Sequence, residues 1–312
     1  MSDSTRLVLP LRFAIFLRSA PLLLLLSFAR SARAADPVVD LAAGKQVLHV
    51  AAECESVACL IEQAYRADPR AASLALSLWN DSGDVPGVGP EELMDGGFRG
   101  TIRLVPQLPI GGYRKHLAWV GEATRAIDGF FGALFANQPP PQYRWHALQF
   151  RFVRSIDKHR PSAYALGWAI EYNVEGSLNI DEKSVRETLF HELFHLNDQA
   201  HGRWSAEHLR HDYQAILTTC GPHPSIKYLA RYAPNDTMVR GGTFYAFQQN
   251  NGDTVEEYAA ELAVRYFKEQ SEMLKAHKLS RPAFKCGPAE NGRAWQAVVS
   301  EFFNGRDLVP PC

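Results

Sequence analysis

Regular alternation of apolar and polar residues predicts a β-strand near the middle of this chain. In residues 143–153, Phe150 and Phe152 fall on one face, while Gln149 and Arg151 fall on the other. A period of two residues is typical of a strand with one buried face. Shorter strands are predicted at residues 101–105, 164–172 and 176–180.

Apolar residues at helical spacing predict several helices around these strands. They cover residues 53–66, 70–79, 113–135 and 254–267, and a further helix begins with the S-x-x-E capping box at Ser184. Several strands therefore precede the Ser184 helix, which indicates an α+β fold. Breaks rich in Gly, Pro and Asp at residues 80–90 separate a small helical region of unknown role, residues 35–98, from a domain of residues 99–312.

The first 34 residues have the composition of an export signal. Arg6, Arg12 and Arg18 precede a short apolar run at residues 20–29, and an A-x-A pattern ends at Ala34. This order is typical of a signal peptide, and the apolar run is too short to span a membrane. We therefore expect an exported protein, periplasmic or secreted, without a stable membrane anchor after cleavage near Ala34.

After export, the chain is mildly acidic and contains five cysteines. Removal of residues 1–34, which contain five Arg and one Asp, changes the net charge from −1 to −5. No basic patch remains, so nucleic acid is not an expected partner. Export places the cysteines in an oxidising compartment. The candidate pairs are Cys54–Cys59 and Cys286–Cys312, although Cys220 could replace either partner of the second pair.

The Ser184 helix contains the pattern H-E-x-x-H, from His191 to His195. Two histidines four residues apart lie one turn apart on the same helix face, so both can bind one metal ion. In metallopeptidases the glutamate after the first histidine, here Glu192, activates water and does not bind the metal. The histidines are not predicted core residues, because the apolar stripe lies on the other side: Val185, Leu189, Leu193, Leu196 and Ala200.

A hydrolytic zinc site needs a third protein ligand, and spacing leaves two candidates. His201 lies six residues after His195, as in H-E-x-x-H-x-x-G-x-x-H, but Asp198 replaces the Gly of that metzincin pattern. Glu257 lies in the predicted helix 254–267, where Glu261, one turn later, could orient one of the histidines. Spacing alone does not decide between His201 and Glu257 as the third ligand.

The residues around these motifs resemble the catalytic domain of anthrax toxin lethal factor and its relatives. That family has H-E-x-G-H with an Asp three residues later, followed by E-F-F-A-E on a later helix. The similar segments here are residues 191–198 and residues 257–261, with Phe194 in place of the family's Gly. The resemblance covers about residues 140–275. It implies a zincin-like fold in which one zinc ion is bound by His191, His195 and Glu257, with Glu192 as the general base.

The resemblance also implies supporting roles around the metal. The family has a tyrosine before the glutamate helix that donates to the oxyanion, and Tyr245 is the nearest match. Asp198 corresponds to the family's Asp, and Glu261 to the last Glu of its second motif. These residues are therefore predicted to support the ligands.

The predicted function is hydrolysis of a peptide or protein substrate by an exported zinc metallopeptidase. An extended substrate would pair with the predicted strand at residues 176–180. One alternative is a metzincin-type peptidase with His201 as the third ligand. A second is a non-catalytic exported zinc-binding module, and a third is an enzyme held inactive by residues 35–98.

Overall fold

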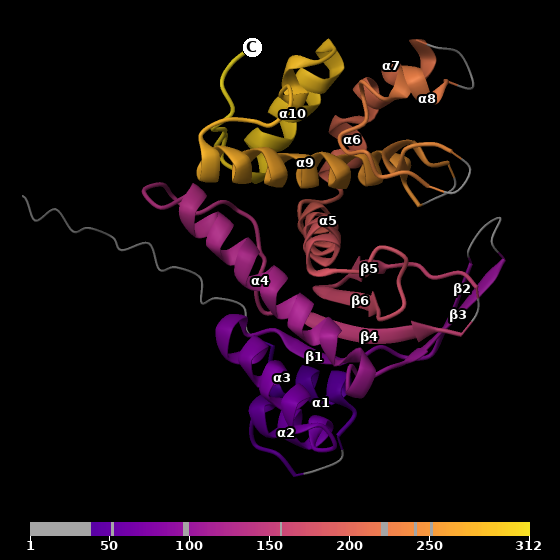
Figure 1. Cartoon of the computed structure of the whole chain (residues 1–312), viewed down its shortest axis with the longest axis vertical. Helices are drawn as coiled ribbons and strands as arrows, with labels where there is room; N and C mark the ends of the chain where they lie inside the picture. Colours follow the sequence, from indigo (N-terminus) through magenta and orange to yellow (C-terminus); the bar gives the residue numbers. More distant parts are fainter. Residues whose placement is uncertain are drawn as a thin grey trace, which may run out of the picture. The chain divides into compact units, whose positions relative to one another are not determined.

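A six-stranded sheet forms the framework of the part of the chain that the structure describes (Figure 1). The computed structural model describes residues 39–50, 53–95, 100–156, 158–219, 224–239, 242–249 and 252–312. The predicted signal peptide and Cys220 lie outside these ranges. Residues from Pro37 to Cys312 belong to one compact unit.

The sheet is mixed, with strand order β2-β3-β4-β6-β5 and with β1 also paired to β4. Its strands are β1 (Val85–Val88), β2 (Glu92–Asp95), β3 (Thr101–Pro106), β4 (Gln149–Ser155), β5 (Ala163–Leu166) and β6 (Ala169–Asn173). β4 pairs in parallel with β1 and β6, and antiparallel with β3. β5 pairs antiparallel with β6 and forms one edge of the sheet.

Helices account for most of the remaining regular structure, so the predicted α+β class is confirmed. The α-helices are α1 (Leu41–Leu48), α2 (Val57–Tyr65), α3 (Pro69–Ser82), α4 (Arg114–Leu134), α5 (Glu182–Ala200), α6 (Trp204–His208), α7 (Arg210–Thr219), α8 (Ile226–Leu229), α9 (Thr254–Ala276) and α10 (Ala289–Phe302). Short 3₁₀ turns are η2 (Gly111–Tyr113), η3 (Tyr245–Phe247) and η4 (Phe284–Cys286). Across the described residues, no helix combines the length and apolar character that a membrane span requires.

Helix α5 lies between the sheet and α9 (Figure 1). Leu189 and Leu193 face Phe150 of β4 across a small internal gap. On another side of α5, the Phe190 ring stacks on Phe267 of α9 with centroids 4.5 Å apart. The sequence predicted one apolar and one polar face for this helix. Both faces are in fact largely buried, because α9 covers the side that contains the histidines.

Helix α5 also begins earlier than the capping box at Ser184 predicts. Its N-cap is Asp181, whose carboxylate accepts a hydrogen bond of 2.8 Å from the Ser184 N–H. Ser184 therefore lies in the first turn of the helix. A carboxylate at this position satisfies a free amide and interacts favourably with the helix dipole.

The strand predicted at residues 143–153 is only half correct, because β4 starts at Gln149. The preceding residues leave the ladder: the Arg144 N–H donates to Asn197 Oδ1 of α5, and the Ala147 N–H donates to the Ser82 carbonyl. Ala147 has a φ of 56°, which is incompatible with a continuing strand. In residues 144–147, hydrogen bonds to α3 and α5 therefore take the place of strand pairing.

The strand predicted at residues 101–105 is confirmed as β3, and the remaining two strand predictions need different corrections. Residues 164–172 form the β5–β6 hairpin, which turns at Gly167 and Trp168, both with positive φ. Residues 176–180 are not a strand but a tight loop. Asn179 fixes this loop because its Nδ2 donates to the carbonyls of Ser162 and Asn173. The sheet edge that lies beside α5 is therefore formed by β5, which pairs with a strand on one side only.

The N-terminal region is not purely helical, because β1 and β2 follow α1–α3 within residues 35–98. β1 pairs with β4, and β2 pairs with β3. Gly87 allows β1 to approach α1, since a Cβ at this position would lie 2.1 Å from a Val47 methyl carbon. The domain boundary expected after residue 98 thus falls inside one continuous sheet, between the paired strands β2 and β3.

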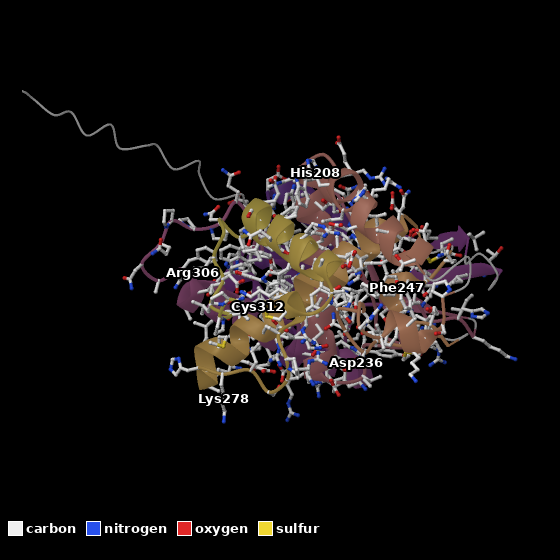
Figure 2. The ribbon with its side chains drawn as sticks, turned by 90° about the horizontal axis from the view of Figure 1, so that it is seen from above. His208, Asp236, Phe247, Lys278, Arg306 and Cys312 are labelled. Atoms are coloured by element: carbon white, nitrogen blue, oxygen red, sulfur yellow. A yellow bond between two sulfur atoms is a disulfide. The ribbon has the colours of Figure 1, made fainter. Side chains whose placement is uncertain are left out.

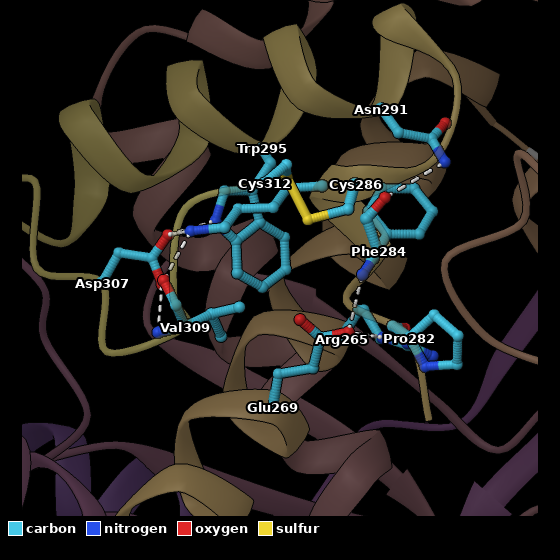
Figure 3. Close-up of a disulfide and its surroundings, with 11 residues drawn as sticks. Arg265, Glu269, Pro282, Phe284, Cys286, Asn291, Trp295, Asp307, Val309 and Cys312 are labelled. Atoms are coloured by element: carbon cyan, nitrogen blue, oxygen red, sulfur yellow. Dashed lines mark hydrogen bonds and ion pairs between the residues drawn. A yellow bond between two sulfur atoms is a disulfide. The ribbon is translucent and has the colours of Figure 1, made fainter. Parts of the chain in front are cut away.

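A buried polar cluster fastens the chain after α9 to that helix, and a disulfide closes that part of the chain on itself (Figure 3). Arg265 Nε donates to Glu269 Oε1, which also accepts the Phe284 N–H. The Cys286–Cys312 disulfide fixes the C-terminus. Cys312 lies near the C-terminal helices α9 and α10 (Figure 2). Cys54 and Cys59 form the second disulfide, so both predicted pairings are confirmed.

We predict that opening Cys286–Cys312 costs more stability than opening Cys54–Cys59. The first links residues 26 apart and the second residues 5 apart. Loop-closure entropy then gives about 3.5 and about 2 kcal/mol, respectively. Urea unfolding of the two double Cys→Ser variants measures the difference in unfolding free energy. The reverse order would show that chain entropy does not govern these disulfides.

Candidate metal centre

Helix α5 places His191 and His195 on the side that α9 covers. Their Nε2 atoms are 3.0 Å apart, as expected for side chains one turn apart on one helix face. His191 is 7% exposed and the intervening Glu192 is 6% exposed. A buried carboxylate therefore lies directly beside two convergent imidazoles.

Glu257, in the first turn of α9, completes the cluster. Its Oε2 lies 3.1 Å from His191 Nε2 and 3.6 Å from His195 Nε2. The two helices are distant in sequence, but they pack against each other along this stretch. The structure thus brings together the three residues that the lethal-factor resemblance implied as metal ligands.

The start of α9 is itself held in place by charged groups. Asp253 caps the helix by accepting a hydrogen bond from the Val255 N–H. Arg203, in the segment after α5, forms ion pairs with Asp253 and Glu256. These contacts fix the first turn of α9 and hence the position of Glu257.

The spacing of the three ligand atoms fits a tetrahedral metal site. Ligands about 2.0–2.2 Å from a zinc ion in a tetrahedron lie about 3.3–3.6 Å from one another. The separations here are 3.0, 3.1 and 3.6 Å. Within the described residues, His191, His195 and Glu257 form the one group of this kind. These residues could therefore hold a metal ion.

Burial and neighbouring charges shift the pKa values of the cluster. Burial lowers the pKa of His191, but hydrogen bonds to Glu257 and Glu261 outweigh this effect and raise the pKa well above its usual value. Burial raises the pKa of Glu257, yet the two imidazoles hold it well below its usual range. A buried anionic Glu257 needs adjacent positive charge, which either a protonated imidazole or a metal ion can supply.

The pKa of Glu192 is shifted in the opposite direction from that of Glu257. Burial raises its pKa, and the nearby His191 and His195 only partly oppose this effect. A carboxylate with a raised pKa is a better proton acceptor near neutral pH. The site therefore contains two carboxylates of different character: Glu257, which stays ionised, and Glu192, which accepts a proton more readily.

A second layer of polar contacts orients His191. Glu261 Oε1 lies 3.4 Å from His191 Nδ1, which directs the other ring nitrogen, Nε2, toward Glu257. Asn235 Nδ2 in turn donates to Glu261 at two points, the carbonyl at 2.7 Å and Oε2 at 3.1 Å. Asn235 is 3% exposed. No motif marks Asn235 in the sequence, because its role depends on how the chain between α8 and η3 folds back onto α9.

Tyr245 lies beside the metal-binding group. Its ring centroid is 5.6 Å from that of His191, in an edge-on arrangement. The Tyr245 N–H donates to the Thr237 carbonyl at 2.8 Å, which fixes η3 against the preceding loop. The predicted tyrosine is thus adjacent to His191.

His201 and Asp198 have partners away from the cluster. His201 Nδ1 lies 2.9 Å from Glu301 Oε1, and the imidazole stacks on Phe302 of α10. Asp198 accepts hydrogen bonds from the Ser205 N–H and hydroxyl, at 2.8 and 2.7 Å. His201 therefore packs against α10, and Asp198 stabilises the turn into α6 rather than bonding to either α5 histidine.

No protein-family model matches the chain, and no match was found among curated proteins or solved structures. The resemblance to the lethal-factor family therefore stays a prediction that rests on the two motifs. The geometry described above is an independent observation, since it depends only on where α5 and α9 place their side chains.

We predict that Glu257, and not His201, contributes to metal binding. Calorimetric titration of Zn²⁺ into the metal-free wild type and variants measures this directly. Glu257→Ala should weaken binding more than about a hundredfold, because one of three ligands is lost. His201→Ala is the matched control and should bind Zn²⁺ as the wild type does. A large loss in His201→Ala with none in Glu257→Ala would instead support the metzincin-type ligand set.

We further predict that Asn235 supports metal affinity through Glu261. Asn235→Ala should weaken Zn²⁺ binding about tenfold, since loss of groups that orient a ligating histidine typically costs 10–100-fold. The same titration measures the effect, with thermal unfolding as a check on folding. Asn80→Ala, at an exposed position of α3, provides the control. Unchanged affinity in Asn235→Ala would mean that Glu261 needs no support.

Proposed function

We propose that this chain is an exported zinc metallopeptidase with a zincin-like catalytic domain. The observation that carries the proposal is the convergence of His191, His195 and Glu257 beside the buried Glu192. Two imidazoles and one carboxylate form a ligand set common in hydrolytic zinc sites, whereas structural zinc sites are usually richer in cysteine. The two disulfides are compatible with export.

Zinc, when bound, acts as a Lewis acid that polarises the substrate carbonyl and acidifies a water molecule. Glu192 takes a proton from the attacking water and later delivers it to the leaving amine. Its raised pKa favours holding the proton between these two steps. Tyr245, whose ring contacts that of His191, is the proposed hydrogen-bond donor to the oxyanion.

The proposed partner is an extended peptide that pairs with β5. One side of this strand pairs with β6, so its other edge can accept a further strand. Gln199, one turn after His195, donates to the Ala165 carbonyl of β5 at 3.3 Å. This contact places β5 beside the metal-binding face of α5, and a peptide that pairs with β5 takes the place of Gln199 at the Ala165 carbonyl. The proposed path along β5 replaces the path expected at residues 176–180.

We predict that Glu192→Gln abolishes hydrolysis but retains zinc. Loss of a general base typically slows a reaction by about 10²–10⁴-fold, while the ligand atoms are unchanged. Zinc content and cleavage of a fluorogenic peptide library measure the two properties separately. Glu182→Gln, at the partly exposed start of α5, is the control and should retain both. Full activity in Glu192→Gln would contradict the assigned role.

A non-catalytic zinc-binding module is the second candidate. Buried Glu192 disfavours it, because a purely structural site has no need of a buried carboxylate with a raised pKa beside its ligands. Wild-type protein that binds zinc but cleaves no member of a broad peptide library would favour this alternative.

A further inference from the structure

A cavity of about 480 Å³ lies where the loop before α5 meets the start of α4. The lining residues come from three segments: Gly112, Tyr113, Lys115 and His116 around the start of α4, Arg160 ahead of β5, and residues 174–176 with Asn179 and Ile180. None of these residues belongs to the metal centre. The cavity is therefore a separate candidate site.

The charges around the cavity favour an anion. Glu175 is the one carboxylate among the lining residues; Tyr113 donates to its Oε1 at 2.8 Å, and Arg160 lies 3.8 Å from its Oε2. Lys115 is exposed, and the Arg160 side chain is 53% exposed. The cavity thus has two accessible cations for one carboxylate. The N-terminal end of the long helix α4 lies here too, but the Asp68 carboxylate already interacts with that end.

His116 adds a neutral, buried imidazole. It is 1% exposed, and burial lowers its pKa to about 4, so the ring is uncharged at neutral pH. His116 Nδ1 lies 3.0 Å from the Tyr172 hydroxyl. If the hydroxyl donates to Nδ1, its hydrogen is satisfied and the ring proton is on Nε2. That Nε2 has no hydrogen-bond partner among the described residues and can donate to an oxygen of a ligand.

Asn179 adds an acceptor. Its Nδ2 donates to two carbonyls, at 2.7 and 2.9 Å, which fixes the orientation of the amide. Its Oδ1 is buried, and no partner for it exists in the described part of the chain. A buried polar atom without a partner is unfavourable, and a ligand N–H can satisfy it. The cavity therefore matches a ligand that has both an anionic group and an N–H donor.

The cavity also adjoins the proposed substrate path. The Ser177 N–H donates to the Arg160 carbonyl, and the Leu178 N–H donates to the Ser162 hydroxyl. These bonds hold the cavity loop against the residues that lead directly into β5. A peptide that pairs with the outer edge of β5 and continues past its N-terminal end passes the same end of the sheet as this loop, where Ile180 is 66% exposed.

We propose that this cavity binds a carboxylate of a peptide, either an acidic side chain or the C-terminal carboxylate. The identification of the ligand as a peptide rests on the proposed function. The carboxylate preference rests on Lys115, Arg160, His116 and Asn179. A peptide residue with a carboxylate supplies both the anion and the backbone N–H that these side chains require.

The test is calorimetric binding of short peptides to the full mature chain with zinc and Glu192→Gln, which prevents turnover. Acetylated and amidated peptides carry one Asp at successive positions, and their partners carry Asn instead. A third set has Asn and a free C-terminal carboxylate. We expect at least one acidic peptide to bind about tenfold more tightly than its neutral partner, as one charge-assisted contact provides. The Asp and free-terminus sets distinguish the two sources of the carboxylate.

The preference should disappear in Lys115→Gln combined with Arg160→Gln, since both cations are then lost. Lys158→Gln removes a nearby exposed cation that does not line the cavity, and it should keep the preference. Thermal unfolding verifies that each variant is folded. Absence of any carboxylate preference, its survival in the double variant, or equal loss in Lys158→Gln would overturn the proposal.

The test of the cavity and the test of the proposed function can fail independently of each other. If the wild type hydrolyses no peptide while the preference follows Lys115 and Arg160, the peptidase proposal fails and the cavity assignment stands. If the wild type hydrolyses peptides but shows no carboxylate preference, the peptidase proposal stands and the cavity assignment fails.

Discussion

The packing of α9 across α5 is the interaction on which the rest of the site depends. It buries the Glu257 carboxylate against His191 and His195, and a buried carboxylate is stable only beside compensating positive charge. That requirement explains why so many polar groups converge there. Glu261 and Asn235 orient the imidazole from behind, and Arg203 fixes the start of α9 from the solvent side.

The remaining structure keeps these two helices in place. The sheet supports α5 through Leu189 and Leu193, while the aromatic side of α5 packs on α9 and α10. The C-terminal segment is closed by the Cys286–Cys312 disulfide and bonded to α9 through Glu269, which accepts the Phe284 N–H. α9 therefore has rigid support on both sides, as a site that must hold ligand atoms within a few tenths of an ångström requires.

Local patterns predicted the features that depend on local spacing. The H-E-x-x-H residues share a helix face because of helix geometry, and Glu257 lies one turn from Glu261 for the same reason. Long-range contacts were not predictable in this way. Nothing in the sequence showed that Ala147 would leave the sheet, that residues 176–180 would form a loop fixed by Asn179, or that Asn235 would reach Glu261. In each case hydrogen bonds between segments distant in the sequence decide the local conformation.

An X-ray absorption spectrum at the zinc K-edge reports the ligands of bound zinc in the intact protein, and so tests whether α5 and α9 together form the metal centre. We expect two imidazole nitrogens and one carboxylate oxygen at about 2.0–2.2 Å, with the imidazole scattering unchanged in His201→Ala. Three imidazoles in the wild type, falling to two in His201→Ala, would contradict a centre built from α5 and α9.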